Sequence, residues 1–518
     1  MTIPAVSGAA AERFGDATAI VDGDLRYSFA ELHRASMHVA GALVAAGVEP
    51  GDRVAIWAPN RSEWVVSYLG LEAAGAALVP INTRFKGREA AEILRRSRAR
   101  ILVTVADFLG TDYVAELRRA DVELPDLKTV IVIGGDTGDG TVGWTDFVGS
   151  ATAADLATAE RRALEVTDDD IADIVFTSGT TGVPKGVMQT HRSTLRVAAD
   201  WVAMTGIGPG DRYLMINPYF HMFGLKAGIL ACLTAGVTML PEPVFDAERV
   251  LRRIAAEAVT VLPGAPTLYQ SILDHPTRAA QDLSSLRVAV TGASDIPVAL
   301  IERIIAELPF PTVIAGYGLT EGGTATATSP SDDPTTIATT VGRPRPGFEV
   351  RIADGAGRDL PAGESGEVLL RSGTVMAGYL DDPAATAEVL SHDGWLRTGD
   401  LGALDAAGNL RIVGRAKDMF IVGGFNAYPA EIENALLRHP DIRQAAVIGI
   451  PDERMGEVGM AFVVVRPGAT VTPAEVIAWS REQMANYKAP RRVEFVAELP
   501  INATGKVVKD DLRRRASA

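Results

Sequence analysis

Apolar runs alternate with amphipathic stretches over roughly the first 320 residues of the chain. Short runs rich in Val, Ile, Leu and Ala predict strands at residues 53–59, 76–82, 99–105 and 128–134. Between them, stretches such as residues 29–47 have helical periodicity, and this one ends on a glycine, as helices commonly do. Because strands buried on both faces read as continuous apolar runs, the alternation predicts an α/β fold built of mixed layers.

The pattern changes after Gly342. Short alternating runs at residues 348–354, 366–372 and 408–414, separated by Gly, Pro and Asp, predict a small antiparallel β subdomain. From Lys417 the pattern reads strand, helix, strand, strand, helix, strand and a basic tail, which predicts a compact α+β domain of about a hundred residues. We therefore expect an N-terminal domain at 1–416, a C-terminal domain at 417–518 and a short hinge between them.

Composition and charge exclude several classes of partner. The chain has 518 residues, enough for several cores, and its 47% hydrophobic and 22% charged content is that of an ordinary globular protein. A net charge of −15 argues against nucleic acid as a partner and offers no basic surface to an anionic membrane. No secretory signal is visible, and the most apolar segment, residues 227–240, is too short to span a bilayer.

The cysteine count bears on the compartment. Cys232 is the single cysteine, so an internal disulfide framework is excluded and a reducing cytoplasm is expected. Its neighbours are apolar, which favours a buried small side chain over a nucleophile. The sequence leaves a homodimer open.

Residues 176–186, FTSGTTGVPKG, are the segment most typical of a binding site. Hydroxyl residues, glycines and one lysine follow a predicted strand: Thr177, Ser178, Gly179, Thr180, Thr181, Gly182 and Lys185. Backbone N–H groups, small hydroxyls and a cation at the end of a strand suit a polyphosphate. A Gly/Thr-rich turn alone is more often an ordinary loop, and this one is not a Walker A loop, since no Gly-Lys-Ser/Thr follows at the required spacing. The hydroxyl density and the lysine favour phosphate here.

A second segment, GYGLTEGG at residues 316–323, combines an aromatic ring, a hydroxyl and a carboxylate. Tyr317 offers a face to a base, Thr320 a donor to phosphate, and Glu321 a hard oxygen ligand for Mg²⁺. Taken alone, such residues are more often ordinary surface or core positions.

Two further segments lie toward the C-terminus. In TGD, residues 398–400, Asp400 is a candidate acceptor for ribose hydroxyls, and Arg415 in GRAKD is a candidate donor to the same sugar. In NATGK, Lys506 follows a glycine turn. A lone lysine near a C-terminus is usually a solvated charge.

Together, and in this order, these segments resemble the AMP-forming acyl-CoA synthetase family, part of the adenylate-forming superfamily with coumarate ligases, luciferases and peptide-synthetase adenylation domains. The resemblance covers essentially the whole chain. It implies a large N-terminal domain with a mobile C-terminal domain, and ATP, Mg²⁺ and CoA as cofactors. It also implies two half-reactions: a carboxylate attacks the α-phosphorus of ATP to give an acyl-adenylate and pyrophosphate, and the thiol of CoA then displaces AMP.

The resemblance also implies a role for each matching residue. Residues 177–185 would hold the β- and γ-phosphates, with Thr177 among the catalytic residues, and Thr320 would contact the α-phosphate. Lys506 would bridge the carboxylate and the α-phosphate, and Glu321 would bind Mg²⁺. The nucleoside would meet Gly292, Ala293, Ser294, Tyr317, Gly318, Asp400 and Arg415. The hinge would be Lys417, where many relatives have Asp, and backbone at Gly423 and Gly424 would line the pantetheine tunnel.

The segment NPYFHMFGLKAG, residues 217–228, matches the mouth of the family's acyl pocket. His221 is the candidate gate, and the expected walls are small or apolar: Leu225, Gly264, Ala265, Thr267 and Gly316. No carboxylate stands beside His221, which argues against an amino-acid substrate. Lys226 is the exception in this wall; an ion pair or solvent exposure is favoured over contact with the substrate.

Residues 216–233, 261–276 and 421–433 resemble the branch of the family that acts in actinobacterial steroid breakdown. That branch activates the propanoate side chain on the fused C and D rings. A medium-chain fatty acid, an aryl acid and the loading of a carrier protein remain alternatives. A nucleotide-binding scaffold without catalysis is disfavoured, because Lys185, Glu321 and Lys506 are all present.

Overall fold

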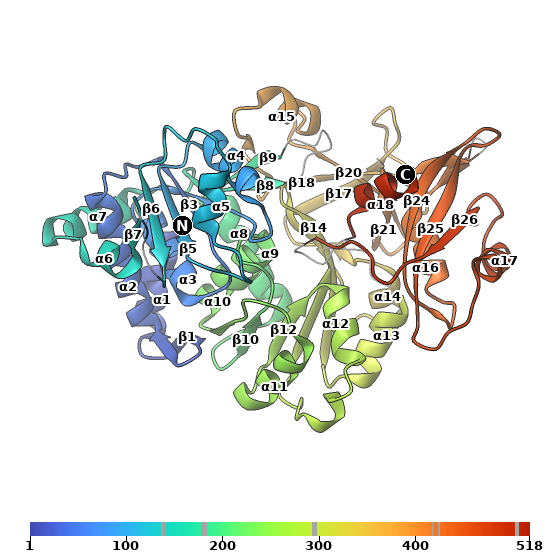
Figure 1. The fold of residues 1–518 in the computed structure, drawn as a ribbon, viewed down its shortest axis with the longest axis horizontal. Helices are drawn as coiled ribbons and strands as arrows, with labels where there is room; N and C mark the ends of the chain where they lie inside the picture. Colours follow the sequence, from blue (N-terminus) through green and yellow to red (C-terminus); the bar gives the residue numbers. More distant parts are fainter. Residues whose placement is uncertain are drawn as a thin grey trace.

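The computed structural model describes residues 1–135, 138, 140–177, 184–292, 298–416, 418–422, 425–502 and 507–517, the side chains of residues 425 and 426 excepted. Figure 1 shows the chain running from the N-terminal sheet and helices, in blue, to the C-terminal unit, in red. No described helix is long and apolar enough to cross a membrane.

The first sheet has a parallel centre, formed by apolar runs that are buried on both faces, as expected for such strands. Its antiparallel edges are β15 and β16 on one side and β2 on the other. In spatial order its strands are β16 (Arg343–Pro344), β15 (Gly323–Ala327), β14 (Thr312–Leu319), β13 (Val288–Gly292), β12 (Val261–Gly264), β10 (Arg212–Met215), β11 (Thr238–Pro241), β1 (Thr18–Asp22) and β2 (Leu25–Ser28).

The second sheet is parallel except for the hairpin β8–β9 and the short strand β19, which pairs antiparallel with β9. Its order is β19 (Gly378–Tyr379), β9 (Lys185–Thr190), β8 (Ile171–Thr177), β4 (Ala77–Pro80), β3 (Arg53–Trp57), β5 (Ile101–Val105), β6 (Thr129–Ile133) and β7 (Val142–Gly143). The strands predicted at 53–59, 76–82, 99–105 and 128–134 are therefore confirmed as β3, β4, β5 and β6.

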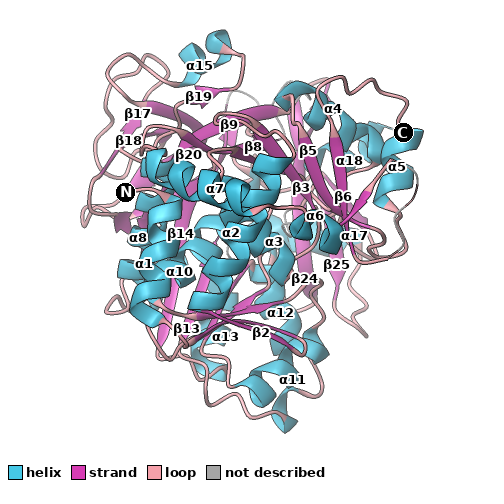
Figure 2. Ribbon diagram, turned by 90° about the vertical axis from the view of Figure 1, so that its left-hand side faces the viewer, coloured by secondary structure: helices cyan, strands magenta, loops and turns pink. Residues whose placement is uncertain are grey.

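Helices fill the space between the two sheets and share one core with both of them. This layer consists of α1 (Ile3–Phe14), α2 (Phe29–Ala45), α3 (Ser62–Ala73), α8 (His191–Thr205), α9 (Met222–Gly224), the π-helix η1 (Leu225–Leu230) and α10 (Ala231–Ala235). Figure 2 shows α1, α2, α3, α8 and α10 gathered together. Helix α2 begins where Ser28 and Glu31 form a reciprocal capping box, so the helix predicted at 29–47 is confirmed. Cys232 is fully buried, as predicted.

The remaining helices of the N-terminal part cover the outer faces of the sheets, pack against α2 or fill the loops. On the first sheet, α11 (Ala247–Glu257), α12 (Pro266–Leu273) and α13 (Val298–Glu307) share a second core with its strands. The others are α4 (Gly87–Ser97), α5 (Tyr113–Arg119), α6 (Trp144–Gly149), α7 (Ala153–Glu165), the 3₁₀ turn η2 (Arg278–Ala280), α14 (Pro334–Thr339) and α15 (Pro383–Val389). The result is the α/β layered fold predicted from the sequence.

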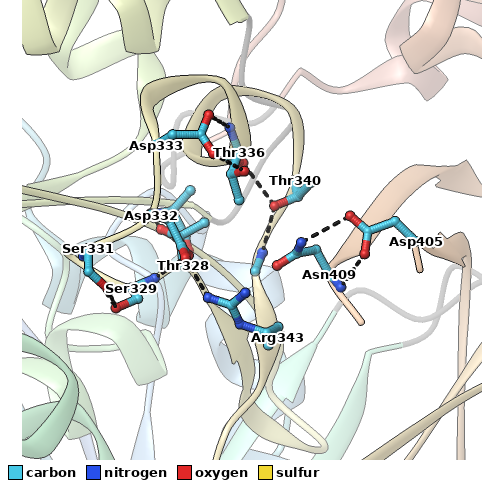
Figure 3. Close-up of polar contacts among 12 residues, drawn as sticks. Thr328, Ser329, Ser331, Asp332, Asp333, Thr336, Thr340, Arg343, Asp405 and Asn409 are labelled. Atoms are coloured by element: carbon cyan, nitrogen blue, oxygen red, sulfur yellow. Dashed lines mark hydrogen bonds and ion pairs between the residues drawn. The ribbon is translucent and has the colours of Figure 1, made fainter. Parts of the chain in front are cut away.

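The predicted antiparallel β subdomain is confirmed as a sheet with strand order β17, β18, β20 and β21. Its strands are β17 (Phe348–Ala353), β18 (Gly366–Ser372), β20 (Leu396–Leu404) and β21 (Leu410–Arg415). Two backbone hydrogen bonds join it to the first sheet. The Val341 N–H donates to the Leu410 carbonyl, and the Leu410 N–H donates to the Gly342 carbonyl, each over 2.8 Å. Figure 3 shows polar side chains around this junction, among them Asn409, whose amide donates to Asp405 over 2.9 Å.

The C-terminal part folds around its own cores. Its strands are β22 (Phe420–Val422), β23 (Phe425–Ala427), β24 (Ile442–Asp452), β25 (Gly456–Val465) and β26 (Arg492–Phe495), and its helices are α16 (Pro429–Leu436), α17 (Pro473–Gln483) and α18 (Lys509–Ser517). The order of strands and helices matches the prediction up to β26, except that β23 is an additional strand between β22 and α16. The last segment differs, because the predicted basic tail forms α18, whose Leu512 is buried against β24 and β25.

Candidate active site

Asp400, Tyr317 and Arg415 meet where the β subdomain faces the first sheet. Asp400 on β20 is 5% exposed and lies opposite Arg415 on β21 in the strand register. Its Oδ2 accepts a hydrogen bond from the Tyr317 hydroxyl over 2.6 Å, and its Oδ1 lies 3.0 Å from Arg415 Nε. Burial, and then the charge of Asp400, raise the pKa of Tyr317 well above its usual value, so the hydroxyl keeps its proton and donates it. The Tyr317 ring is therefore fixed in place.

Arg415 is held charged by this arrangement. Burial, the largest single influence, would lower its pKa, but the acidic groups around it, Asp400 foremost, together outweigh burial, and the pKa of the guanidinium is raised. The ion pair joins a buried carboxylate, Asp400, to a half-exposed guanidinium, since the Arg415 side chain is 49% exposed. Two predicted ribose contacts, Asp400 and Arg415, are thus brought together with the predicted base contact, Tyr317.

The turn from β14 to β15 presents Thr320 and Glu321. The turn is tight, because Leu319 pairs with Gly323 across it. Its carbonyl oxygens at Thr320, Glu321 and Gly322 accept hydrogen bonds from Gln189 Nε2 (3.0 Å), Met376 N (2.8 Å) and Thr374 Oγ1 (2.7 Å). Donors from the second sheet and the β subdomain thus fix the backbone from which the side chains of Thr320 and Glu321 project.

Glu321 is connected through Tyr379, a residue that the sequence did not single out, to the predicted phosphate hairpin formed by β8 and β9. The Tyr379 hydroxyl donates to Glu321 Oε1 over 3.1 Å, and Lys185 Nζ lies 4.9 Å from the centre of the Tyr379 ring. Burial raises the pKa of the Glu321 carboxyl, while the Tyr379 hydrogen bond lowers it. Tyr379 and Lys185 stand on neighbouring strands, β19 and β9, which explains why they meet. No pattern local to Tyr379 indicates this contact.

The donor set around Glu321 is compatible with Mg²⁺. Within the described part of the chain, no three His, Cys, Asp or Glu side chains gather as a protein-only metal site. Mg²⁺ is commonly bound by one or two carboxylates together with water and substrate phosphates, so one carboxylate beside a phosphate loop suffices. Glu321 would be that ligand, and the cation would offset the burial that raises its pKa.

The phosphate hairpin itself is defined by its two ends. Thr177 closes β8 and Lys185 opens β9, and the two residues pair across the hairpin. Several predicted site residues lie outside the described residues: Ser178, Gly179, Thr180, Thr181, Gly182, Ala293, Ser294, Lys417, Gly423, Gly424 and Lys506.

Small residues occupy the carboxyl ends of β12, β13 and β14, the edge at which open α/β sheets bind ligands. Gly292 on β13 pairs with Gly316 on β14. Gly264 on β12 pairs with Thr291, the residue before Gly292. A Cβ at Gly292 would lie 2.6 Å from the Gly316 carbonyl oxygen, so this position requires glycine. At Gly318, which continues β14, a Cβ would lie 2.4 Å from the Gly323 oxygen.

The predicted acyl segment begins beside this edge. His221 is partly buried and caps α9, its Nδ1 accepting from the Phe223 N–H over 3.2 Å. Asn217, in the same loop, donates to the carbonyl of Pro263 on β12 over 3.2 Å, which places the loop against the strand that ends at Gly264. Ala265 follows directly as the residue before α12. Leu225 is fully buried at the start of η1, within the core.

Comparison with known proteins adds independent information. The model of the AMP-binding enzyme family matches residues 8–380, and that of the AMP-binding enzyme C-terminal domain matches residues 431–506. The chain is 50% identical to the 3-[(3aS,4S,7aS)-7a-methyl-1,5-dioxo-octahydro-1H-inden-4-yl]propanoyl:CoA ligase of Rhodococcus jostii, with 99% of this chain and 98% of that protein covered. It is 52% identical to the ligase of the same name from Mycobacterium tuberculosis, over the same shares.

Solved structures agree over the whole chain. The anthranilate CoA ligase AuaEII in complex with anthranoyl-AMP superposes with a TM-score of 0.92 at 30% identity, covering 100% of this chain and 97% of that one. ATP-bound MatB from Rhodopseudomonas palustris superposes with a TM-score of 0.87 at 31% identity, covering 99% of each chain.

Proposed function

The chain belongs to the AMP-binding enzyme family, and on that premise we propose that it is an AMP-forming acyl-CoA synthetase, an acid–thiol ligase. It activates a carboxylic acid with ATP to an acyl-adenylate and pyrophosphate, and then transfers the acyl group to CoA. The observation that supports this most strongly is the 50–52% identity, over nearly the full length, to two CoA ligases.

The acid we propose is the fused bicyclic propanoate for which those two ligases are named, which places the reaction in steroid catabolism. A feruloyl-CoA synthase and a medium-chain acyl-CoA ligase are 37% and 33% identical to the chain, so aryl and fatty acids are less well supported. The small residues Gly264, Ala265 and Gly316 are compatible with a bulky ring system, because they place little or no side chain at the carboxyl edge of the first sheet.

The site geometry fits the first half-reaction. Negative charge develops on the α-phosphate and on the departing pyrophosphate, and preorganised cations and dipoles stabilise it. Lys185 and the end of β8 at Thr177 would face the β- and γ-phosphates, Thr320 the α-phosphate, and Asp400 the ribose beside Tyr317. Mg²⁺ bound at Glu321 would supply further charge neutralisation to the leaving group.

Lys506 and the hinge complete the proposal. We take residues 1–416 as the adenylate-forming domain and 417–518 as the mobile domain that carries Lys506. Lys506 would neutralise charge between the carboxylate and the α-phosphate, and rotation about Lys417 would then exchange it for the loop at Gly423 and Gly424, beside which pantetheine passes. His221 would separate the acyl pocket from the thiol's path.

A panel of acids tests the substrate. Pyrophosphate release and thioester formation with free CoA are measured for the bicyclic propanoate, straight-chain acids of medium length and aryl acids. We expect the highest kcat/KM with the bicyclic acid, and thioester formation without a carrier protein. A higher kcat/KM with straight-chain acids would exclude the bicyclic acid while preserving the ligase. Pyrophosphate release without a thioester would point to carrier loading, and the absence of acid-dependent pyrophosphate release would contradict catalysis.

A further inference from the structure

Lys226 is a buried charge in the middle of the predicted acyl segment. The residue is 0% exposed, and its Nζ lies 3.1 Å from Oδ1 of Asp173, which is also 0% exposed. The second oxygen of Asp173 accepts a hydrogen bond from the Thr194 hydroxyl over 2.6 Å. The ion pair connects η1, in the helical layer, with β8, in the second sheet.

Other ionisable side chains surround this pair from α3 and α8. Glu72 and Tyr68 on α3 are fully buried and interact electrostatically with Asp173, and Glu72 also with Lys226. His191 Nε2 lies 3.4 Å from Glu72 Oε2, and its Nδ1 accepts the backbone N–H of Ile3 over 3.2 Å. Because Nδ1 accepts, a neutral His191 carries its proton on Nε2, directed to Glu72. Burial lowers the pKa of His191 to about 4, in keeping with the neutral form.

Both members of the pair lie close, along the chain, to residues of the proposed site. Asp173 and Thr177 stand on the same face of β8, because side chains alternate along a strand, and they are about 13 Å apart at the usual rise per residue. Lys226 directly follows Leu225 and lies in the π-helix that comes after His221. A π-helical turn is rare and is frequently found at functional sites. The pair thus connects β8, which ends at the proposed phosphate site, with η1, which belongs to the proposed acyl segment.

Stability alone does not account for such a pair. Burying two charges has a large desolvation cost, and apolar residues of similar volume are often equally stable or more so. An ion pair adds a restraint on geometry, because Nζ and Oδ1 must remain at contact distance. The pair thereby fixes η1 against β8 in one register.

We propose that Lys226 is a positioning residue for adenylation, which, through Asp173, holds the acyl pocket at the distance from the phosphate hairpin that brings the carboxylate to the α-phosphorus. The proposal rests on the proposed ligase function. It predicts that loss of the pair impairs adenylation but not the transfer of the acyl group to CoA. Adenylation joins two separate molecules and depends on this distance, whereas in the acyl-adenylate a covalent bond already fixes it.

The experiment uses the full-length enzyme with Lys226→Met and the double variant Lys226→Met/Asp173→Leu. The single variant leaves Asp173 buried without its partner and is expected to be less stable; the double variant removes both charges and is expected to recover the unfolding midpoint in urea. In both, kcat/KM for the acid in pyrophosphate release should fall by about 10- to 100-fold, as for a misplaced reactant. KM for ATP, and thioester formation from supplied acyl-adenylate and CoA, should be unchanged.

A control removes one member of a less buried ion pair at the amino ends of the strands of the first sheet. Arg287 precedes β13, its side chain is 38% exposed, and it lies 2.5 Å from Asp211, which precedes β10. Arg287→Met should change stability without changing kcat/KM for the acid.

The outcomes separate this inference from the proposed function. Wild-type kcat/KM in the double variant would overturn it, because the pair would then serve stability only. Equal loss of both half-reactions, or a double variant that does not fold, would overturn it as well. A wild-type enzyme that releases no pyrophosphate with any acid would instead overturn the proposed function, together with this inference.

Discussion

Replacing Tyr379 by Phe tests whether Glu321 is the magnesium ligand. The substitution removes the hydroxyl that donates to Glu321 Oε1 over 3.1 Å and keeps the ring beneath Lys185. A hydrogen bond to a charged group is worth about 1.5–3 kcal/mol. That free energy corresponds to a rise of roughly 10- to 160-fold in KM for Mg-ATP if it is fully expressed in binding.

The same substitution has a pH signature whose sign follows from the structure. As a magnesium ligand, Glu321 would bind the cation as an anion, and burial has already raised its pKa above the usual value. The Tyr379 hydrogen bond lowers that pKa, so its loss raises it further. Activity requires the ionised carboxylate and therefore increases as pH rises through this pKa. We expect the acidic limb of kcat/KM for Mg-ATP to move to higher pH in the variant.

The assay is pyrophosphate release with Mg-ATP varied at saturating acid, repeated across the acidic pH range. Tyr113→Phe is the control, because the Tyr113 hydroxyl donates to the Thr83 carbonyl over 2.7 Å and its ring stacks on Trp57, away from Glu321. That control should change stability by about 1 kcal/mol and leave KM for Mg-ATP unchanged. A Tyr379→Phe enzyme with wild-type KM and an unmoved acidic limb would refute the reasoning.

Three further substitutions address the other parts of the site. Lys506→Ala should abolish pyrophosphate release while CoA still attacks supplied acyl-adenylate, and equal loss of the two half-reactions would contradict a swinging domain. Asp400→Asn should weaken ATP binding measured by calorimetry by about 10-fold or more, since it removes one member of the charged pair with Arg415; unchanged affinity would exclude Asp400 from the ribose site. Gly292→Ala should lower the free energy of unfolding in urea by about 1–3 kcal/mol, because its Cβ would meet a backbone oxygen at 2.6 Å. Gly149→Ala, with no atom within 4 Å of the new Cβ, is the matched control and should be neutral or stabilising.

Local pattern was sufficient to predict the strands and helices that the sequence analysis places. Apolar runs identified β3, β4, β5 and β6 because these strands are buried on both faces. The capping pair Ser28 and Glu31 fixes the start of α2 through neighbours in the chain. Helix α18 escaped prediction because its arginines suggested a solvated tail, while a single side chain, Leu512, attaches it to the core.

Contacts between distant segments could not be predicted in this way. Tyr379 meets Glu321 because β19 pairs with β9, and nothing near either residue in the sequence specifies that pairing. For Lys226 the sequence favours an ion pair or solvent exposure, and the ion pair is confirmed; nothing near Lys226 in the sequence indicates that its partner is Asp173. The role of the glycine-threonine loop remains a prediction from its residues and from the resemblance, and the role of Lys506 remains a prediction from the resemblance.

The two-residue strand β19 has a consequence for recombining this enzyme with relatives. It returns from the β subdomain to cover the outer edge of the hairpin at β9, so the hairpin is shielded by a segment encoded almost two hundred residues downstream. A chimaera whose crossover falls between β9 and β19 would therefore combine the proposed nucleotide-binding turn of one parent with an edge strand from the other. Crossovers placed after Leu380 keep the two together and should yield active hybrids more often.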